Sequence, residues 1–462
     1  MKIHRLLIAN RGEIAARIIR ACQQLGIETV LAASDADLYS VPAKLADKTV
    51  RLGPSAPAQS YLDVERVLVV AREARAQAIH PGYGFLAENA RLARACREAG
   101  ITFIGPDENA LAAAGDKLQA REHAIAAGLP VAPGAPVADA DDALDVAKKI
   151  GFPILIKAVG GGGGRGMKAV REPTEMKHQV ELAAAEAEAA FSDPRLYVER
   201  YVERGRHIEV QILGDGCGDV AHLGTRDCSI QRRYQKLVEE APAPLLDETL
   251  RSALHEAAVS FGKRLAYRSA GTVEFLVDDD RRTFYFLEMN ARIQVEHPVT
   301  EAITGLDLIA EQIAIAEGEG LRLAHTDVDF SGHAIECRIN AEDPVQDFRP
   351  SPGTVTRVEL PVGPGMRVDT HIEAGVSVPP FYDSLLAKII AHGKDRAEAL
   401  ARMKAALASA RIEGITTNLP VHAALMSDGA FAAGGVHTTY FPGFLEDYLK
   451  RLSGLRAALG GA

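Results

Sequence analysis

The sequence lacks the cysteine patterns and the leading hydrophobic segment that mark several classes of protein. Its five cysteines, in 462 residues, form no Cys-x-x-Cys pair and no zinc-ligand spacing. This distribution argues against a zinc ribbon or a disulfide scaffold and favours reduced thiols in a cytosolic protein. The first residues, MKIHRLLIANRGE, contain only the four-residue apolar run LLIA, which is too short for a signal-peptide core or a membrane span. The sequence therefore predicts a cytoplasmic protein.

The sequence also lacks an excess of basic residues. Lysine and arginine number 52 against 62 aspartates and glutamates, which gives a net charge of -10. Such a balance disfavours nucleic acid or an anionic membrane as the main partner, although it is compatible with a local basic pocket for small anions. A content of 47% hydrophobic and 25% charged residues is typical of a soluble globular protein, and the length suits about three domains.

Residues 5–105 alternate strand and helix patterns. HRLLIAN and ETVLAAS are typical of buried strands, and GEIAARIIRACQQLG between them has apolar residues at helical spacing. The alternation predicts a doubly wound parallel sheet with helices on both faces. The first strand-to-helix turn, ANRGEIA, has one glycine and lacks the Gly-x-Gly-x-x-Gly of dinucleotide-binding proteins, so NAD binding is disfavoured.

The rest of the chain mixes strands, hairpin turns and helices, so the fold class is α/β combined with α+β. A helical segment at 107–129 followed by the proline-rich VAPGAPVA indicates a domain edge. A further helix is expected at about 395–410, and the tail at 453–462 is expected to be weakly structured. We expect four units, at residues 1–113, 114–203, 204–330 and 331–450.

Five consecutive glycines, Gly160 to Gly164, separate two apolar, strand-like runs in ILIKAVGGGGGRGMKAV. A Walker loop has its lysine after the glycines, whereas Lys157 precedes them and a second strand follows, so we expect a hairpin with a glycine tip. Backbone amides free of side chains can wrap phosphate oxygens, and Lys157 can add a positive charge. The alternative is a hairpin that is merely flexible.

Polar side chains recur at alternate positions in the stretch from 270 to 300, where two apolar runs flank the turn DDDRR. Four polar residues of the second run lie two apart and should share one strand face: Glu288, Asn290, Arg292 and Gln294. Glu274 of the first run falls close to opposite Glu288 if the turn is centred near residue 281. Two carboxylates and an amide suit Mg²⁺, and Arg292 beside them suits an anion. The alternative is a solvated strand face.

A set of motifs, in order and spacing, resembles the biotin carboxylase family of ATP-grasp enzymes: IANRGEIA, HPGYGFLAEN, FIGP, GDK, IKAVGGGGGRGM, RDCSIQRR, EEAPAP, EMNARIQVEHPVTE and ECRINAEDP. The resemblance covers about residues 3–450. IQVEHPVTE and ECRINAEDP are specific because of their length, whereas the glycine run alone would be a weak signal. The resemblance implies that the four units are an N-terminal biotin carboxylase domain, an ATP-grasp lid with its linker, an ATP-grasp core and a C-terminal biotin carboxylase domain.

The resemblance also implies a carbon–nitrogen ligase that works in two steps. ATP phosphorylates bicarbonate to carboxyphosphate, and the CO₂ released from it passes to the ureido nitrogen of biotin. Mg²⁺ or Mn²⁺ would be held by Glu274, Glu288 and Asn290. The residues implied in ATP binding are Lys117, Lys157, Gly163, Gly164, Glu199, Arg200, Tyr201, Val202, His207, Gln231, Tyr234, Glu274 and Glu288.

Four positions are implied in bicarbonate binding: Lys236, Arg292, Gln294 and the backbone of Val295. Glu296 matches the family's catalytic base, and a carboxylate among cations needs no raised pKa to be ionised. Arg338 would stabilise negative charge on the biotin ureido oxygen, with an ion pair to Glu336 or Glu342 as the alternative role. Tyr83 would pack against the biotin ring.

Two departures from the family pattern affect the expected function. Tyr234 stands where the family usually has histidine in QRRHQK, so this side chain cannot carry positive charge. The Ala-Met-Lys-Met biotinylation motif is absent, and the nearest string, ARMKAAL, has a helical pattern. Biotin would then arrive on a separate biotin carboxyl carrier protein, with carboxyltransferase subunits as further partners and, by family analogy, a homodimeric state.

The final carboxyl acceptor stays open. The simplest reading is the biotin carboxylase subunit of acetyl-CoA carboxylase, in fatty acid biosynthesis. The alternatives are the same subunit serving another acyl-CoA or pyruvate, and a nucleotide-binding regulatory paralogue that has lost catalysis.

Overall fold

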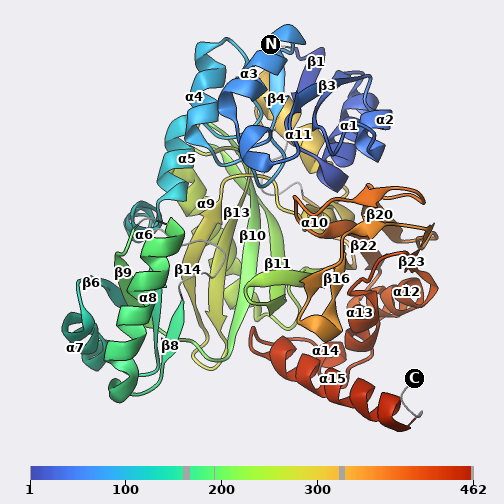
Figure 1. The fold of residues 1–462 in the computed structure, drawn as a ribbon. Helices are drawn as coiled ribbons and strands as arrows, with labels where there is room; N and C mark the ends of the chain where they lie inside the picture. The colour runs from blue at the N-terminus through green and yellow to red at the C-terminus, as the bar shows by residue number, and fades with distance from the viewer. Residues whose placement is uncertain (1, 160–166, 192, 322–327, 459–462) are drawn as a thin grey trace.

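The computed structural model describes residues 2–159, 167–191, 193–321 and 328–458, and these fold around three main sheets (Figure 1). The N-terminal residues form a parallel sheet, residues 134–200 a small antiparallel sheet, and the remainder a long antiparallel sheet whose strands run through the middle of the molecule. The expected class, α/β combined with α+β, is confirmed.

The N-terminal sheet is parallel and has the order β3-β2-β1-β4-β5. Its strands are β1 (Arg5–Ile8), β2 (Glu28–Ser34), β3 (Lys48–Gly53), β4 (Ala78–His80) and β5 (Thr102–Phe103). The helices around it are α1 (Gly12–Leu25), α2 (Val41–Leu45), α3 (Val64–Glu73) and α4 (Ala90–Glu98), with the 3-10 turn η1 (Pro57–Gln59). Leu7 joins one buried cluster and its neighbours Leu6 and Ile8 join another, so β1 is buried on both faces. The doubly wound prediction is confirmed.

The helical segment expected at 107–129 is two helices, α5 (Glu108–Gly115) and α6 (Lys117–Ala126). They are separated by Asp116, whose extended backbone ends α5 and whose carboxylate caps the amides that begin α6. This cap places Lys117 at the first position of α6.

The second sheet has the order β6-β9-β7-β8 and is antiparallel. It contains β6 (Gly134–Val137), β7 (Ile154–Ala158), β8 (Lys168–Val170) and β9 (Leu196–Arg200), with α7 (Ala140–Ile150), η2 (Pro173–Glu175) and α8 (Met176–Phe191). Ile154 pairs with Val170, so the two apolar runs form the expected antiparallel hairpin. The glycines of its tip, Gly163 and Gly164 among them, lie outside the described residues.

The central sheet is antiparallel, with the order β14-β13-β10-β11-β12-β15-β22-β20. Its strands are β10 (Gly205–Asp215), β11 (Val220–Arg232), β12 (Gln235–Ala241), β13 (Arg268–Asp278), β14 (Thr283–Asn290), β15 (His333–Asn340), β20 (Met366–Thr370) and β22 (Leu385–Gly393). Strands from both sides of residue 330 therefore share one sheet. One face packs on α9 (Glu248–Arg264), where Ile208 and Val210 meet Leu254 and Phe261 in one buried cluster. The opposite face carries polar side chains.

Helices α10 (His297–Thr304) and α11 (Leu308–Glu317) follow β14. The C-terminal part adds α12 (Arg396–Ser409), α13 (Leu419–Met426), α14 (Gly429–Ala433) and α15 (Tyr440–Ala458). Short elements complete it: β16 (Glu342–Asp343), η3 (Pro344–Gln346), β17 (Arg349–Pro350), β18 (Gly353–Thr354), β19 (Arg357–Glu359), β21 (Ser377–Val378) and β23 (Arg411–Glu413). The helix expected at 395–410 is confirmed, and ARMKAAL lies within it.

The weak structure expected for the tail is wrong for residues 453–458, which continue α15. Phe441 and Phe444 at the start of this helix enter the buried cluster of the C-terminal part, so tertiary packing holds it in place. None of the helices in the described residues is long and apolar enough to cross a membrane.

Candidate active site

A pocket of about 1410 Å³ lies between the second sheet, the central sheet and the segments that follow β1 and β4. Its lining includes every described candidate residue except Glu296: Tyr83, Lys117, Lys157, Glu199, Arg200, Tyr201, Val202, His207, Gln231, Tyr234, Lys236, Glu274, Glu288, Asn290, Arg292, Gln294, Val295 and Arg338. Glu296 lies behind this lining, fully buried, and contacts two of its members. Residues far apart in the sequence are thus brought to one cavity.

The carboxylate hairpin has the expected register, because Glu274 of β13 lies directly opposite Glu288 of β14. A β-bulge makes this possible: Phe275 pairs with Phe286, so Leu287 is the extra residue. On a regular strand Phe286 and Glu288 would share one face. The bulge lets Phe286 enter the apolar cluster against α9 while Glu288 lines the pocket.

The expectation that four polar residues share one strand face is wrong for two of them. Strand β14 ends at Asn290, so Arg292 and Gln294 lie in the loop before α10. They still approach Asn290, because Arg292 Nη2 donates to Asn290 Oδ1 at 2.9 Å and Nη1 donates to Gln294 Oε1 at 3.0 Å. Arg292 Nε also donates to Glu88 Oε2 at 3.0 Å, which ties the loop to the N-terminal part.

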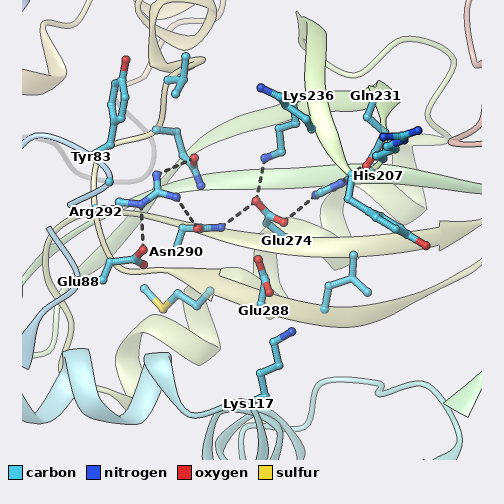
Figure 2. Close-up of a pocket in the computed structure, with 18 of the residues that line it drawn as sticks. Tyr83, Glu88, Lys117, His207, Gln231, Lys236, Glu274, Glu288, Asn290 and Arg292 are labelled. Carbon is cyan, nitrogen blue, oxygen red and sulfur yellow. Dashed lines mark hydrogen bonds and ion pairs between the residues drawn. The ribbon is translucent and has the colours of Figure 1, made fainter. Parts of the chain in front are cut away.

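Figure 2 shows Glu274 at the centre of the site, with Glu288 below it and Lys117 further below. Glu274 is contacted by Lys236 Nζ and Asn290 Nδ2, both at 2.8 Å, and by His207 Nε2 at 2.8 Å (Figure 2). Burial opposes the charge of Glu274, but Lys236 and His207 hold the pKa of its carboxyl below the usual range. The charge of Glu274 in turn raises the pKa of His207 against the opposing effect of burial.

Glu288 has the opposite environment. Burial and the charge of Glu274 opposite it raise the pKa of the Glu288 carboxyl, and Lys117 only partly offsets this. Two acids side by side therefore favour a cation between them. Asn290 directs its amide nitrogen at Glu274 and its oxygen at Arg292, so a metal would use the remaining lone pair of that oxygen. The donor set fits Mg²⁺, which takes few protein oxygens.

A cross-strand row explains why the sheet tolerates these acids. Arg226 of β11 lies opposite Glu209 of β10, which lies opposite Glu274, which lies opposite Glu288. Like charges directly opposite one another are destabilising, and cations compensate them here. Arg226 Nε donates to Glu209 Oε1 at 2.5 Å, and Lys236 Nζ contacts Glu209 Oε2 at 2.6 Å.

Sequence reasoning missed Glu209 and Arg226, which are both fully buried. A signal for Glu209 was present, because the polar residues of HIEVQIL recur with a period of two in an otherwise apolar strand. Arg226 stood in the motif RDCSIQRR without an assigned role. Its guanidinium also donates to Gln211, Thr272 and Thr300, so with Glu209 four of its five N–H groups are used within the protein.

Glu296 lies between two cations. Its Oε1 accepts from Lys236 Nζ at 2.8 Å, and its Oε2 accepts from Arg338 Nη2 at 2.8 Å. Burial opposes ionisation, but Lys236 and Arg338 hold the pKa of Glu296 well below the usual range. Arg338 Nε contacts Glu239 Oε1 at 2.6 Å, so its ion pairs are with Glu239 and Glu296, and not with Glu336 or Glu342, the partners of its alternative role.

The nucleotide side of the pocket carries the remaining candidates. Lys157 of β7 forms an ion pair with Glu199 of β9. Burial lowers the pKa of Lys117. The amides of Arg200 and Tyr201 donate to the carbonyls of Pro133 and Pro153.

Two further candidates are Gln231, which lies beside His207, and Tyr83, which belongs to the N-terminal part. Gln231 Nε2 lies 3.4 Å from His207 Nδ1 and donates to Cys228 O at 3.2 Å. The Tyr83 hydroxyl donates to Glu13, and burial raises the pKa of Tyr83 well above its usual value. Because His207 contacts Glu274 on one side and Gln231 on the other, it is part of the Glu274 network and not an isolated structural histidine.

Tyr234 occupies a two-residue hairpin turn between β11 and β12. Arg233 and Tyr234 have φ of 49° and 66°, the left-handed pair that a type I′ turn requires and that asparagine and glycine favour. The side chain is 51% exposed and lines the pocket, and its partial burial raises the pKa of the hydroxyl, so it stays neutral. An aromatic residue in this conformation is strained.

We expect Tyr234→Asn to raise the free energy of unfolding by about 1 kcal/mol, because asparagine adopts the left-handed conformation at lower cost. Denaturant unfolding measures this change, and Tyr234→Phe is the matched control that keeps the ring and the strain. Equal stability of Tyr234→Asn and Tyr234→Phe would show that the turn is unstrained.

Three family profiles match consecutive parts of the chain. They are the biotin carboxylase N-terminal domain at residues 2–111, the ATP-binding domain of the carbamoyl-phosphate synthase L chain at 116–324, and the biotin carboxylase C-terminal domain at 336–442. Together they span most of the sequence.

Curated relatives are similar over nearly their whole length. Biotin carboxylase 1 of Bacillus subtilis is 49% identical over 448 residues, which cover 96% of this chain and 99% of the relative. One of the pyruvate carboxylase subunits of Methanothermobacter thermautotrophicus is 50% identical over 448 residues, which cover 96% of this chain and 90% of the relative.

Solved structures of biotin carboxylases are similar to this chain over nearly its whole length. The biotin carboxylase of Campylobacter jejuni in a βγ-ATP complex has a TM-score of 0.92 at 43% identity, with 96% of this chain and 99% of that chain covered. The biotin carboxylase domain dimer of Hydrogenobacter thermophilus 2-oxoglutarate carboxylase, solved with MgADP, ADP and bicarbonate, has a TM-score of 0.91 at 45% identity with the same coverage. The chain belongs to the biotin carboxylase family, whose members use ATP to carboxylate biotin.

Proposed function

We propose that the chain phosphorylates bicarbonate with ATP and transfers the resulting CO₂ to biotin held on a separate carrier protein. The observation that carries this proposal is the position of Glu296, a buried carboxylate held ionised between Lys236 and Arg338 beside the Glu274–Glu288 pair. The candidate base, anion site and metal site thus adjoin one another, which supports a role in carboxyphosphate formation.

ATP and the metal form the first part of the proposed site. Mg²⁺ or Mn²⁺ bound by Glu274, Glu288 and Asn290 would screen charge between the terminal phosphates and the attacking oxygen. Lys117 and Lys157 would bind phosphate oxygens, together with the glycine hairpin and its Gly163 and Gly164. The pairing of Lys157 with Glu199 implies that nucleotide binding exchanges this carboxylate for a phosphate.

The adenosine would lie against His207, Gln231, Tyr234 and the run from Glu199 to Val202. The amides of Arg200 and Tyr201 already donate within the protein. This run would therefore contact the adenine through its carbonyl oxygens and through Val202. Tyr234 can donate from its neutral hydroxyl to a ribose or a phosphate.

Bicarbonate would bind to Lys236, Arg292, Gln294 and the backbone of Val295, where Glu296 removes its proton. An ionised carboxylate is competent as a base without a raised pKa, because the developing dianion is held by the neighbouring cations. Arg338 would then stabilise the ureido oxygen of biotin, which makes the ureido nitrogen more nucleophilic, and Tyr83 would pack against the biotin ring.

The wider assignment follows the same proposal. We place the chain in the cytoplasm as a homodimer that works with a biotin carboxyl carrier protein and with carboxyltransferase subunits, most simply those of acetyl-CoA carboxylase. The division into units at 1–113, 114–203, 204–330 and 331–450 belongs to the proposal too. Lys404 of ARMKAAL lies inside α12, which disfavours it as a biotin attachment site.

Pyruvate is the alternative acceptor, because a pyruvate carboxylase subunit is as similar to this chain as the biotin carboxylases are. The carboxyltransferase that co-purifies with the chain distinguishes the two.

ATP hydrolysis tests the reaction itself. We expect hydrolysis with Mg²⁺ to require bicarbonate and to rise when free biotin is added, with labelled bicarbonate appearing in carboxybiotin. Arg338→Met is the matched variant that should bind ATP normally and lose the response to biotin. Nucleotide binding without hydrolysis under these conditions would instead identify a regulatory paralogue.

A further inference from the structure

His297 belongs to the motif IQVEHPVTE, but the proposed reaction gives it no role. It is the first residue of α10 and is fully buried. Its Nδ1 lies 2.7 Å from the carbonyl oxygen of Gln294. A carbonyl oxygen only accepts hydrogen bonds, so the Nδ1 atom must carry the proton.

The surroundings of His297 keep the ring neutral. Burial and the charges of Lys388, Arg17 and Arg367 lower the pKa of His297 well below its usual value. Glu301 Oε2 lies 3.9 Å from Nε2, and Nε2 makes no hydrogen bond within the described residues. The single proton of the ring is therefore on Nδ1, and the hydrogen bond to Gln294 persists across the pH range in which enzymes work.

Lys388 holds the next carbonyl in the same loop. This lysine of β22 is fully buried, and its Nζ donates to Val295 O at 2.8 Å. Glu13 Oε2 lies 3.1 Å and Asp369 Oδ2 3.8 Å from the same nitrogen. Glu13 belongs to α1 and also accepts from the Tyr83 hydroxyl. Lys388 therefore connects the N-terminal part to the loop before α10.

Two consecutive carbonyls, those of Gln294 and Val295, are thus held from outside the pocket. The peptide bond that joins these residues is trans, so its C=O and N–H point in opposite directions. When the Gln294 carbonyl is turned to His297, the Val295 amide is turned away from it. Gln294 and Val295 both line the pocket. An anion there needs an N–H, and a flipped peptide would present a carbonyl oxygen that repels it.

We propose that His297 and Lys388 are positioning residues for the anion substrate: they hold the carbonyls of Gln294 and Val295 so that the Val295 amide faces bicarbonate. This rests on the proposed function, which places bicarbonate at Arg292 and Val295. Neither side chain touches the substrate, and each acts through the backbone.

The test uses the matched pair His297→Asn and His297→Leu in the full chain. Asparagine has nearly the shape of leucine but keeps a side-chain N–H that can reach Gln294 O. We expect His297→Leu to raise KM for bicarbonate by about 10–100-fold, the range seen when a supporting hydrogen bond is lost, with KM for ATP unchanged within about twofold. His297→Asn should restore most of the loss. Lys388→Met should show the same bicarbonate-selective effect.

Two controls separate this inference from the proposed function. Arg292→Ala removes a direct bicarbonate contact and should raise KM for bicarbonate whether or not His297 matters. A melting curve should first show that His297→Leu is folded. If Arg292→Ala then raises KM for bicarbonate and His297→Leu leaves it unchanged, the positioning role is overturned and the proposed function stands. If the wild-type chain forms no carboxybiotin, both fall.

The tautomer gives a second measurement that needs no variant to be active. Nitrogen-15 NMR of the wild-type protein, assigned with His297→Asn, should show a protonated Nδ1 and an unprotonated Nε2 at every pH from about 6 to about 9. A proton on Nε2 would leave Nδ1 unable to donate and would overturn the proposal even if a leucine variant failed to fold.

Discussion

Glu296→Gln is expected to lower kcat for bicarbonate-dependent biotin carboxylation by about 10²–10⁴-fold, the usual contribution of a positioned general base. Glutamine keeps the size of the side chain and can accept a hydrogen bond from Lys236 or Arg338, but it cannot take a proton. Steady-state assays at saturating ATP, bicarbonate and biotin measure the loss. Nucleotide binding should be retained, because Glu296 lies behind the pocket lining and contacts Lys236 and Arg338, not the proposed phosphate-binding lysines.

The control for this variant is Glu373→Gln, which removes a half-exposed carboxylate paired with Lys44 on the surface. It should keep wild-type kcat.

Because Lys236 and Arg338 lower the pKa of Glu296, the base stays ionised as the pH falls toward the ordinary carboxylate range. Any acidic limb of the wild-type pH profile should therefore persist at an unchanged position when Glu296 is replaced. A variant with more than about a tenth of wild-type kcat would assign the base elsewhere.

Glu288→Gln is expected to reduce turnover with Mg·ATP by about 100-fold, because it removes one of two charged metal ligands. The effect should be partly overcome by raising the Mg²⁺ concentration, which distinguishes a metal ligand from a residue that acts only in chemistry. The unliganded protein should be at least as stable as the wild type. Burial and repulsion from Glu274 disfavour the Glu288 charge, and glutamine removes it.

Two measurements check this second variant. Kinetics at several Mg²⁺ concentrations give the apparent metal affinity, and thermal unfolding without ligands gives the stability. Glu248→Gln, whose side chain is 83% exposed on α9, is the matched control and should match the wild type in both. Turnover of Glu288→Gln within about twofold of wild type at saturating Mg²⁺ would remove this strand face from the metal site.

The N-terminal sheet and the carboxylate hairpin could be predicted because their signals are local. Apolar runs such as ETVLAAS form a strand, β2, with the expected bounds, since a fully buried strand needs little more than a short β-favouring run between turns. The turn between β13 and β14 sets a register that brings Glu274 to within one residue of Glu288, and the bulge at Leu287 completes the pairing. The missed strand β3 has only two buried residues, Leu52 and Gly53, so its pattern is weak.

The bulge at Leu287 and the end of β14 at Asn290 could not be predicted, because a simple alternation assumes an unbroken strand. The same limit explains α15, whose C-terminal turns have a weak pattern and follow a helix anchored by Phe441 and Phe444. In each case packing against distant elements decides the conformation.

The sequence by itself determined the fold class, the hairpin with its approximate register and the residue types of the candidate site, since these depend on periodicity, turns and motif spacing. Only the tertiary structure decided which charges meet. Lys236 reaches Glu209, Glu274 and Glu296, which lie 27, 38 and 60 residues from it in the chain, because β12, β10, β13 and the loop before α10 converge. Asp369 and Lys388 likewise lie side by side on β20 and β22. Buried charges require partners, and long-range strand pairing supplies them in a way that no local pattern records.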